Sequence, residues 1–303
     1  MKSKEFWEGK NIAVTGASGF LGSHFVEILP ELGSNVFPLS RETTNLLDYE
    51  NTKEALKDID VIINCAALDG NTEYKKTHSA EILNSNLRIT SNILNAAREN
   101  GTEDVVLVSS AEIYSPSAPN PITEEDDYRR YDEHTTNGYT LSKKFSEILA
   151  DLYSREYGLR IYLPRPSNIY GPRDHFDEQT SRVIPNFINK VSSGKPIEIW
   201  GDGSQVRQFI YVKDVVRTVL TMVENQMDGK LNVSTSEVTT ILDLAQKVFK
   251  ALDMESDIRL DKSKTVGTMN RVIDTSEMHK IINFTPVSLD SGLLRTVKWY
   301  RGN

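Results

Sequence analysis

Residues 12–22 read Ile-Ala-Val-Thr-Gly-Ala-Ser-Gly-Phe-Leu-Gly, a short apolar run and then a turn with glycines at 16, 19 and 22. A helical pattern begins at residue 20, and we expect it to end at Gly33. Glycine permits a tight turn, and the first turn of a helix presents free N–H groups and a positive dipole end to an anion. This order predicts a dinucleotide phosphate site formed by Gly16, Ser18, Gly19, Phe20, Leu21 and Gly22.

Outward from this turn, short β-branched runs alternate with longer helical patterns. We expect strands at residues 36–39, 61–63, 105–108 and 161–163, and helices near 49–56, 80–100 and 139–157. Such alternation is typical of a parallel sheet with helices on both faces, and strands that are apolar throughout fit burial on both faces. The predicted fold class is α/β, with a Rossmann-type doubly wound parallel sheet.

The pattern changes after residue 163, where proline and glycine become frequent. A later amphipathic helix is expected over 240–252, with Thr239 or Thr240 placed to cap it. We therefore expect two parts. The dinucleotide-binding domain would comprise residues 1–165 with 204–232, and a smaller interleaved substrate lobe would comprise residues 166–203 with 233–303.

Charge and composition exclude several classes of partner. The 303 residues contain 43 acidic and 35 basic side chains, which give a formal net charge of −8. A nucleic-acid binder needs a basic footprint, so we expect no nucleic acid partner. No run of about 18 apolar residues predicts a membrane span. The acidic run 124–127 is interpreted as a solvated loop.

Cysteine and histidine usage is sparse. The one cysteine, Cys65, cannot form a disulfide within the chain, and it fits a reducing, cytoplasmic setting. The histidines do not show the spacing of a metal site with cysteine or carboxylates, so we expect no metal.

The end of the second predicted strand bears on the choice of cofactor. An NAD site usually has an acidic residue there for the ribose 2′-hydroxyl, whereas an arginine suits a 2′-phosphate. The chain has Ser40 and Arg41 at this point. NADP(H) is therefore favoured, with a solvated surface arginine and NAD as the alternative.

Tyr139 and Lys143 lie four residues apart at the start of a predicted helix, so they project from one face. A lysine ammonium lowers the pKa of a neighbouring phenol, which could then exchange the proton that accompanies hydride transfer. Ser110 follows the fourth strand, at the carboxyl edge that faces the ligand in such sheets, and could donate a hydrogen bond to a substrate oxygen. These residues and the glycine turn form one coherent site.

With these elements the sequence resembles the extended short-chain dehydrogenase/reductases of the NAD-dependent epimerase/dehydratase family, which act on nucleotide sugars. Residues 40–48 and 170–185 resemble those of the GDP-L-fucose synthases within it. The other segments that carry the resemblance are residues 15–24, 64–67, 109–114, 139–143, 165–172 and 201–214.

The resemblance implies roles for individual residues. Ser110, Tyr139 and Lys143 would be catalytic, with Tyr139 as the acid/base at the sugar C4 oxygen. Ala66, Ile169 and Lys143 would contact the cofactor. The substrate-binding residues would be Asn168, Arg182, Val183, Arg207 and Arg271, of which Asn168, Arg207 and Arg271 would hold the nucleotide diphosphate. Family members often dimerise, here through helices 80–100 and 139–157.

Two positions depart from the fucose synthase pattern. Glu112 and Arg182 stand where those enzymes carry the cysteine and histidine that epimerise C3 and C5. Glu112 could act as a base, but arginine stays charged and is a poor acid. Ala111 lacks the carboxyl that sugar 4,6-dehydratases use. What remains is NADP(H)-dependent redox chemistry at C4, as in a GDP-4-keto-6-deoxy-sugar reductase; the alternatives are an NAD-dependent 4-epimerase and a non-catalytic NADP-sensing protein.

Overall fold

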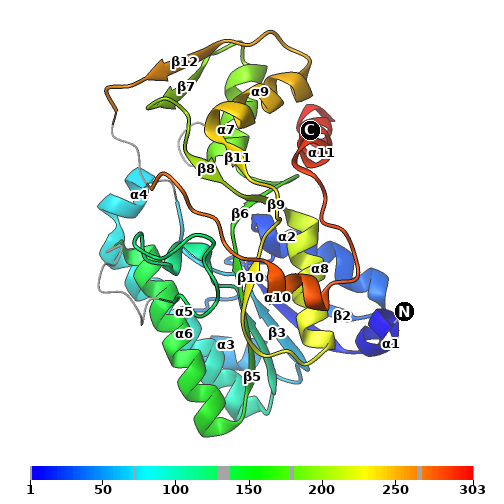
Figure 1. Cartoon of the computed structure of the whole chain (residues 1–303). Coiled ribbons are helices and arrows are strands. Elements are labelled where there is room, and N and C mark those ends of the chain that lie inside the picture. The colour runs from blue at the N-terminus through cyan, green and yellow to red at the C-terminus, as the bar shows by residue number, and fades with distance from the viewer. Residues whose placement is uncertain (1, 71, 128–136, 178–180, 265–267, 303) are drawn as a thin grey trace.

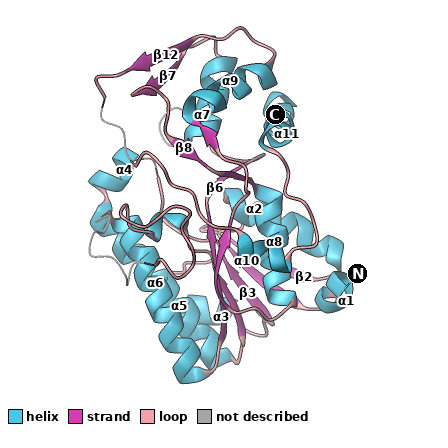
Figure 2. Ribbon diagram, in the orientation of Figure 1, coloured by secondary structure: helices cyan, strands magenta, loops and turns pink. Residues whose placement is uncertain are grey.

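The computed structural model describes residues 2–70, 72–127, 137–177, 181–264 and 268–302. Its centre is a six-stranded, fully parallel sheet with the strand order β10-β5-β4-β3-β1-β2 (Figures 1 and 2). The predicted α/β fold class with a doubly wound parallel sheet is thereby confirmed. The sheet strands are β1 (Asn11–Thr15), β2 (Asn35–Leu39), β3 (Val61–Asn64), β4 (Asp104–Leu107), β5 (Arg160–Pro166) and β10 (Gly229–Val233).

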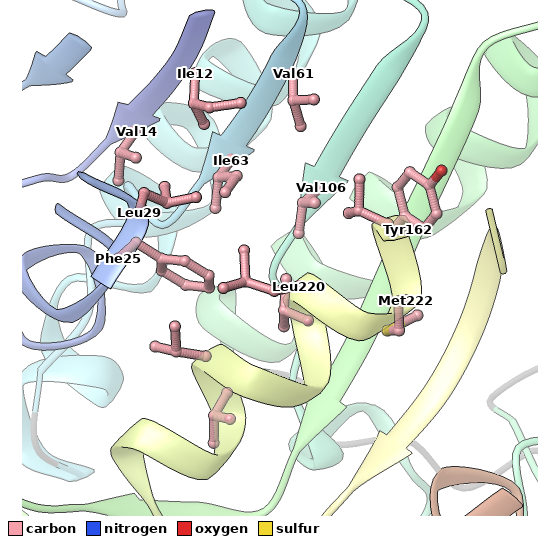
Figure 3. Packing of buried hydrophobic residues seen from close by; sticks show 14 of the residues in the cluster. Ile12, Val14, Phe25, Leu29, Val61, Ile63, Val106, Tyr162, Leu220 and Met222 are labelled. Atoms are coloured by element: carbon pink, nitrogen blue, oxygen red, sulfur yellow. The ribbon is translucent and has the colours of Figure 1, made fainter. Parts of the chain in front are cut away.

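Helices cover both faces of the sheet because successive side chains of each strand point to opposite sides. Ile12 and Val14 of β1 pack with α2 (Phe20–Ile28) and α8 (Val212–Glu224), as Figure 3 shows. Ala13, between them, packs on the opposite face. The helices of that face are α3 (Tyr49–Ala55), α5 (Ser79–Asn100) and α6 (Gly138–Tyr157).

A second group of elements forms its own apolar cluster above the carboxyl edge of the sheet (Figure 1). Thr240 caps α9 by accepting a hydrogen bond from the Asp243 N–H, so one of the two predicted caps is confirmed. The elements of this group are β6 (Asn168–Tyr170), α7 (Val183–Ser192), β7 (Ile197–Trp200), β8 (Val206–Arg207), β9 (Phe209–Tyr211), β11 (Thr239–Thr240), α9 (Ile241–Leu252), β12 (Ile258–Asp261) and α11 (Leu289–Gly302).

The predicted domain boundaries remain a prediction, and packing crosses them at several residues, of which Phe209 and Met278 are examples. Phe209, assigned to the dinucleotide domain, lies in the apolar cluster of the second group. Met278 of α10 (Ser276–Ile281), assigned to the substrate lobe, packs against the sheet with α8.

Two local expectations change. The helix that follows the glycine turn, α2, ends at Ile28 and continues as a 3₁₀ turn, Leu29–Leu32, before Gly33 ends it in the left-handed conformation. The interpretation of 124–127 as a solvated loop is wrong. Asp127 is buried and accepts a hydrogen bond from Lys230 at 2.7 Å, because this loop folds under the edge strand β10.

The chain passes from β2, on one side of β1, to β3 on the other. Ligands bind in such sheets where the strand order reverses, at the carboxyl ends of the strands. Here that point lies between the ends of β1 and β3. No helix within the described ranges is long and apolar enough to cross a membrane.

Candidate functional site

The glycine turn after β1 is a close-packed backbone cradle. Gly16 has φ +64°, and a Cβ on it would lie 2.8 Å from the Ala66 nitrogen. A Cβ on Gly22 would lie 2.2 Å from the Gly16 carbonyl oxygen. The N-cap of α2 is Gly19, which supplies no side-chain cap. The first N–H groups of α2 are therefore free for an anion, so these residues fit the pyrophosphate of a dinucleotide.

The other predicted cofactor residues lie around this turn and differ in how exposed they are. The Ala66 N–H donates to the Asn64 side-chain oxygen at 3.1 Å, which fixes the segment after β3 against the turn. Ile169 lies in β6 and packs against the sheet cluster. Ser40 is half-buried, and Arg41 is exposed in the loop after β2, beside an open hollow that also has acidic residues in its wall.

Tyr139, Lys143 and Ser110 converge at the carboxyl end of β4. The ammonium nitrogen of Lys143 lies 5.7 Å from the centre of the Tyr139 ring and donates to the Val108 carbonyl at 2.5 Å. The Ser110 hydroxyl lies close enough to the Tyr139 phenol to lower its pKa, although other causes outweigh this effect. The structure thus brings together the three side chains that the sequence predicts to act together.

The electrostatics of Tyr139 differ from the sequence interpretation. Burial raises the pKa of the phenol well above its usual value of ~10, and the charges of Asp69 and Glu112 raise it further. Burial also lowers the pKa of Lys143. The net pKa of Tyr139 is therefore raised, and not lowered as the sequence interpretation expects, because desolvation and two carboxylates outweigh any lowering by the lysine. At neutral pH Tyr139 is a protonated phenol, which is the form that can give a proton.

Glu112 is paired with a residue that the sequence did not single out. Its two carboxylate oxygens lie 3.0 and 3.2 Å from the ammonium nitrogen of Lys75. The same nitrogen lies 3.2 Å from Asp69 and 4.1 Å from the centre of the Tyr139 ring. Lys75 comes from α4 (Thr72–Thr77), shortly after β3 reaches the ligand edge. That position was the one signal that could have pointed to it.

A buried ion pair, Glu147 with Arg165, lies next to the predicted catalytic residues. Glu147, one turn after Lys143 on α6, receives two hydrogen bonds from Arg165, at 3.0 and 2.6 Å. It also accepts a hydrogen bond of 2.5 Å from Ser109, the residue before Ser110. All three side chains are buried, so the pair is held without solvent competition and fixes the strand end that carries Ser110.

Arg207 and Arg271 form a half-buried pair of like charges. Burial lowers the pKa of each guanidinium, and the charge of Arg271 lowers that of Arg207 further. Arg207 donates to the backbone carbonyls of Val206, Thr268 and Met269. Within the part of the chain that the structure describes, neither guanidinium is paired with a carboxylate at ion-pair distance. Two half-buried guanidinium groups without a carboxylate partner among the described residues favour the binding of an anion such as a diphosphate.

The remaining predicted substrate residues lie along the same opening. Asn168 starts β6 and donates to the Gln208 carbonyl at 2.8 Å. Arg182 is exposed at the N-cap of α7, with its guanidinium 5.5 Å from the centre of the Phe20 ring, and Val183 is the first residue of that helix. Arg182 is also close enough to lower the pKa of Tyr139, so the predicted substrate loop lies near both the glycine turn and Tyr139. No metal-binding cluster occurs among the described residues.

Comparisons with known proteins fit this geometry. The model of the NAD dependent epimerase/dehydratase family matches residues 12–234. A dTDP-4-dehydro-6-deoxy-D-allose reductase from a Streptomyces species is 43% identical over 317 residues, covering 97% of each chain. The GDP-L-fucose synthase of Escherichia coli K12 is 28% identical over 312 residues, again covering 97% of each. UDP-glucose 4-epimerase from Thermotoga maritima, solved with UDP-glucose, superposes with a TM-score of 0.86 at 25% identity, covering 96% of this chain and 99% of its own.

Proposed function

Because the chain belongs to the NAD-dependent epimerase/dehydratase family, we propose that it reduces the C4 keto group of a nucleotide-activated 4-keto-6-deoxy sugar with NADPH. The observation that carries the proposal is the convergence of Tyr139, Ser110 and Lys143 at the carboxyl end of β4, where the half-buried phenol can give a proton. A 4-keto reductase needs a proton donor at the C4 oxygen.

The residues have separable tasks in this reaction. The nicotinamide, when bound, supplies the hydride. Tyr139 gives its proton to the C4 oxygen, and Ser110 donates a hydrogen bond to that oxygen. Lys143, held by the Val108 carbonyl, orients the cofactor and the tyrosine. Arg207 and Arg271 bind the diphosphate, which places the sugar over the phenol.

We propose dTDP as the nucleotide carrier of the sugar, with GDP as the second candidate. The allose reductase named above, at 43% identity, acts on a dTDP-sugar, whereas the E. coli GDP-sugar enzyme is 28% identical. Glu112 and Arg182 stand in place of the epimerising cysteine and histidine, which also fits a reductase that leaves C3 and C5 unchanged. Comparing initial rates with dTDP- and GDP-4-keto-6-deoxy sugars tests the nucleotide; a faster rate with the GDP-sugar would reverse this assignment.

We propose NADP(H) as the cofactor because Arg41 follows β2 where an NAD site usually carries an acidic residue. Arg41→Asp should weaken NADPH binding about tenfold or more, the loss of one charge-assisted phosphate contact, and leave NADH binding unchanged or tighter. Arg259→Asp is a matched control, since that exposed arginine lies in β12. Tighter binding of NADH than of NADPH by the unaltered protein would contradict the choice.

An NAD-dependent 4-epimerase is the second candidate function, favoured by the superposition on UDP-glucose 4-epimerase. Such an enzyme oxidises and re-reduces C4 without a net consumption of cofactor. Purified protein that retains bound NAD⁺ and turns over without added cofactor would establish this candidate and exclude the reductase.

We also propose a homodimer formed through α5 and α6, in a reducing cytoplasmic setting that suits the free thiol of Cys65. Phe145 and Leu152 lie seven residues apart on one face of α6 and are 48% and 47% exposed. Phe145→Glu should halve the mass measured by light scattering, whereas Phe37→Glu, at an equally exposed phenylalanine on β2, should not. A monomeric unaltered protein would refute the dimer.

A further inference from the structure

The predicted catalytic set does not include Lys75, yet its ammonium lies within this site. Its side chain is 14% exposed, and its charge lies between the carboxylates of Asp69 and Glu112. A lysine this desolvated is held by specific partners, since burial of an unpaired charge is costly.

The backbone fixes Lys75 relative to Tyr139. The Ser79 hydroxyl donates to the Lys75 carbonyl at 2.8 Å and accepts from the Gly138 N–H at 2.8 Å. Gly138 directly precedes Tyr139, and a Cβ on it would lie 1.8 Å from the Ser79 carbonyl oxygen. The start of α6 and the junction of α4 with α5 are thus in direct contact. The position of the ammonium over the Tyr139 ring is therefore built into the fold.

The contact with Glu112 engages both oxygens of its carboxylate. A carboxylate beside a ketone can take a proton from the adjacent ring carbon, which leaves the electron pair of the broken C–H bond on the keto oxygen as an enolate. Return of a proton to that carbon restores the ketone, with exchange or inversion at the carbon. Both oxygens of Glu112 are held by the Lys75 ammonium, so the carboxylate must give up one of these hydrogen bonds before it can take a proton.

We propose that Lys75 is a positioning residue that holds Glu112 in an ion pair, and so restricts this site to C4 reduction by preventing proton exchange at the carbons flanking C4. This inference rests on the proposed function, because the exchange matters only for a 4-keto sugar. Glu112 is then an acceptor for substrate hydroxyls, and its role as a base is suppressed. The lysine fulfils this role without touching the reacting atoms.

The test measures deuterium uptake by the 4-keto substrate. The protein, with NADP⁺ so that no reduction can occur, is incubated with a dTDP-4-keto-6-deoxy sugar in D₂O, and the ring protons next to C4 are followed by NMR against an enzyme-free sample. Lys75→Met should speed exchange about tenfold or more over the unaltered protein, because the carboxylate of Glu112 is then free of a charge-assisted contact that engages both its oxygens. Lys75→Arg should restore the slow rate.

Two further variants control the result. Lys76→Met removes an exposed charge from the same helix and should match the unaltered protein. Lys75→Met combined with Glu112→Gln should lose the added exchange. If Lys75→Met does not fold, Lys75→Gln is measured in the same way.

The inference is overturned if the Lys75 variants exchange no faster than Lys76→Met, or if the unaltered protein already exchanges rapidly. A separate assay with NADPH distinguishes this failure from that of the proposed function. An unaltered protein that reduces the substrate keeps the proposed function whatever the exchange shows, and one that reduces no nucleotide 4-keto sugar loses it.

Discussion

Tyr139 is the residue on which the proposed chemistry depends, and its surroundings set the direction of proton flow. Burial, Asp69 and Glu112 all oppose ionisation of its phenol. A phenol kept neutral gives a proton to a developing alkoxide, and it would first have to lose that proton before it could accept one from a sugar hydroxyl. The side-chain environment therefore keeps the phenol in the protonated form that a reduction uses.

Tyr139→Phe removes this proton donor without changing the shape of the ring. The rate of C4 reduction should fall about 10²- to 10⁴-fold, the usual value of a positioned general acid, and NADPH affinity should stay the same. Steady-state rates and a fluorescence titration with NADPH measure the two quantities. Reduction at an unchanged rate would show that another group protonates the C4 oxygen.

The pH profile of reduction follows from the same raised pKa. The active form is the protonated phenol, and it is lost only as the pH rises through the folded pKa, which lies well above 10. The maximal rate should therefore show no decline that belongs to Tyr139 up to about pH 10. A decline centred near pH 7 that disappears in a tyrosine variant with residual activity would place the phenol's pKa there instead.

At the scale of an element, the unit of β1, the glycine turn and α2 tolerates little added volume. Gly22→Ala would bring a Cβ to 2.2 Å from the backbone oxygen of Gly16, which cannot move without opening the turn. We expect a loss of stability of about 1–3 kcal/mol and weak NADPH binding, measured by thermal unfolding and titration. Gly302→Ala, in α11 with open space around it, is the control. Normal NADPH binding by the Gly22→Ala protein would contradict the proposal that the glycine turn binds the cofactor.

The order of elements could be predicted from the sequence because local patterns determine it. The apolar strands, the glycine turn and the Tyr139–Lys143 spacing lie within segments whose periodicity is strong, and the sheet formed as expected. The proximity of Ser110, Tyr139 and Lys143 could be predicted for the same reason, since the carboxyl ends of parallel strands meet at one edge of the sheet. Ser110 and Tyr139 needed only that rule to be placed together.

Other features depend on contacts that no local pattern records. Lys75 reaches the site because Ser79 and Gly138 bring two helix starts together, and those residues lie 59 positions apart. The pKa of Tyr139 depends on its burial and on Asp69, which a spacing rule does not include. The acidic loop at 124–127 was expected to be solvated because no basic partner is nearby in the sequence. Its partner Lys230 lies 103 residues away from Asp127.

At the scale of the whole molecule, the predicted cofactor residues lie along the carboxyl edge of the sheet, whereas Arg207 lies in the second group of elements with Arg271 beside it. Arg207 comes from β8, which pairs with β11, and Arg271 is near enough to Glu112 for that carboxylate to raise its pKa. The proposed substrate site is therefore built from both parts of the molecule.

Arg207→Gln removes one guanidinium from the proposed diphosphate site. The KM for the nucleotide sugar should rise about tenfold to a hundredfold, the loss of one or two charge-assisted hydrogen bonds, while NADPH affinity stays constant. Arg155→Gln, an exposed arginine on α6, serves as the control. Unchanged KM values would place the diphosphate elsewhere.

We expect this chain to reduce C4 and to leave the neighbouring carbons unchanged. The most direct measurement uses NADPH deuterated at the transferring position of the nicotinamide and a dTDP-4-keto-6-deoxy sugar in ordinary water, with NMR of the product. We expect one deuterium, at C4 only, and the substrate's configuration kept at C3 and C5. A product without deuterium at C4, or one inverted at C3 or C5, would contradict the account.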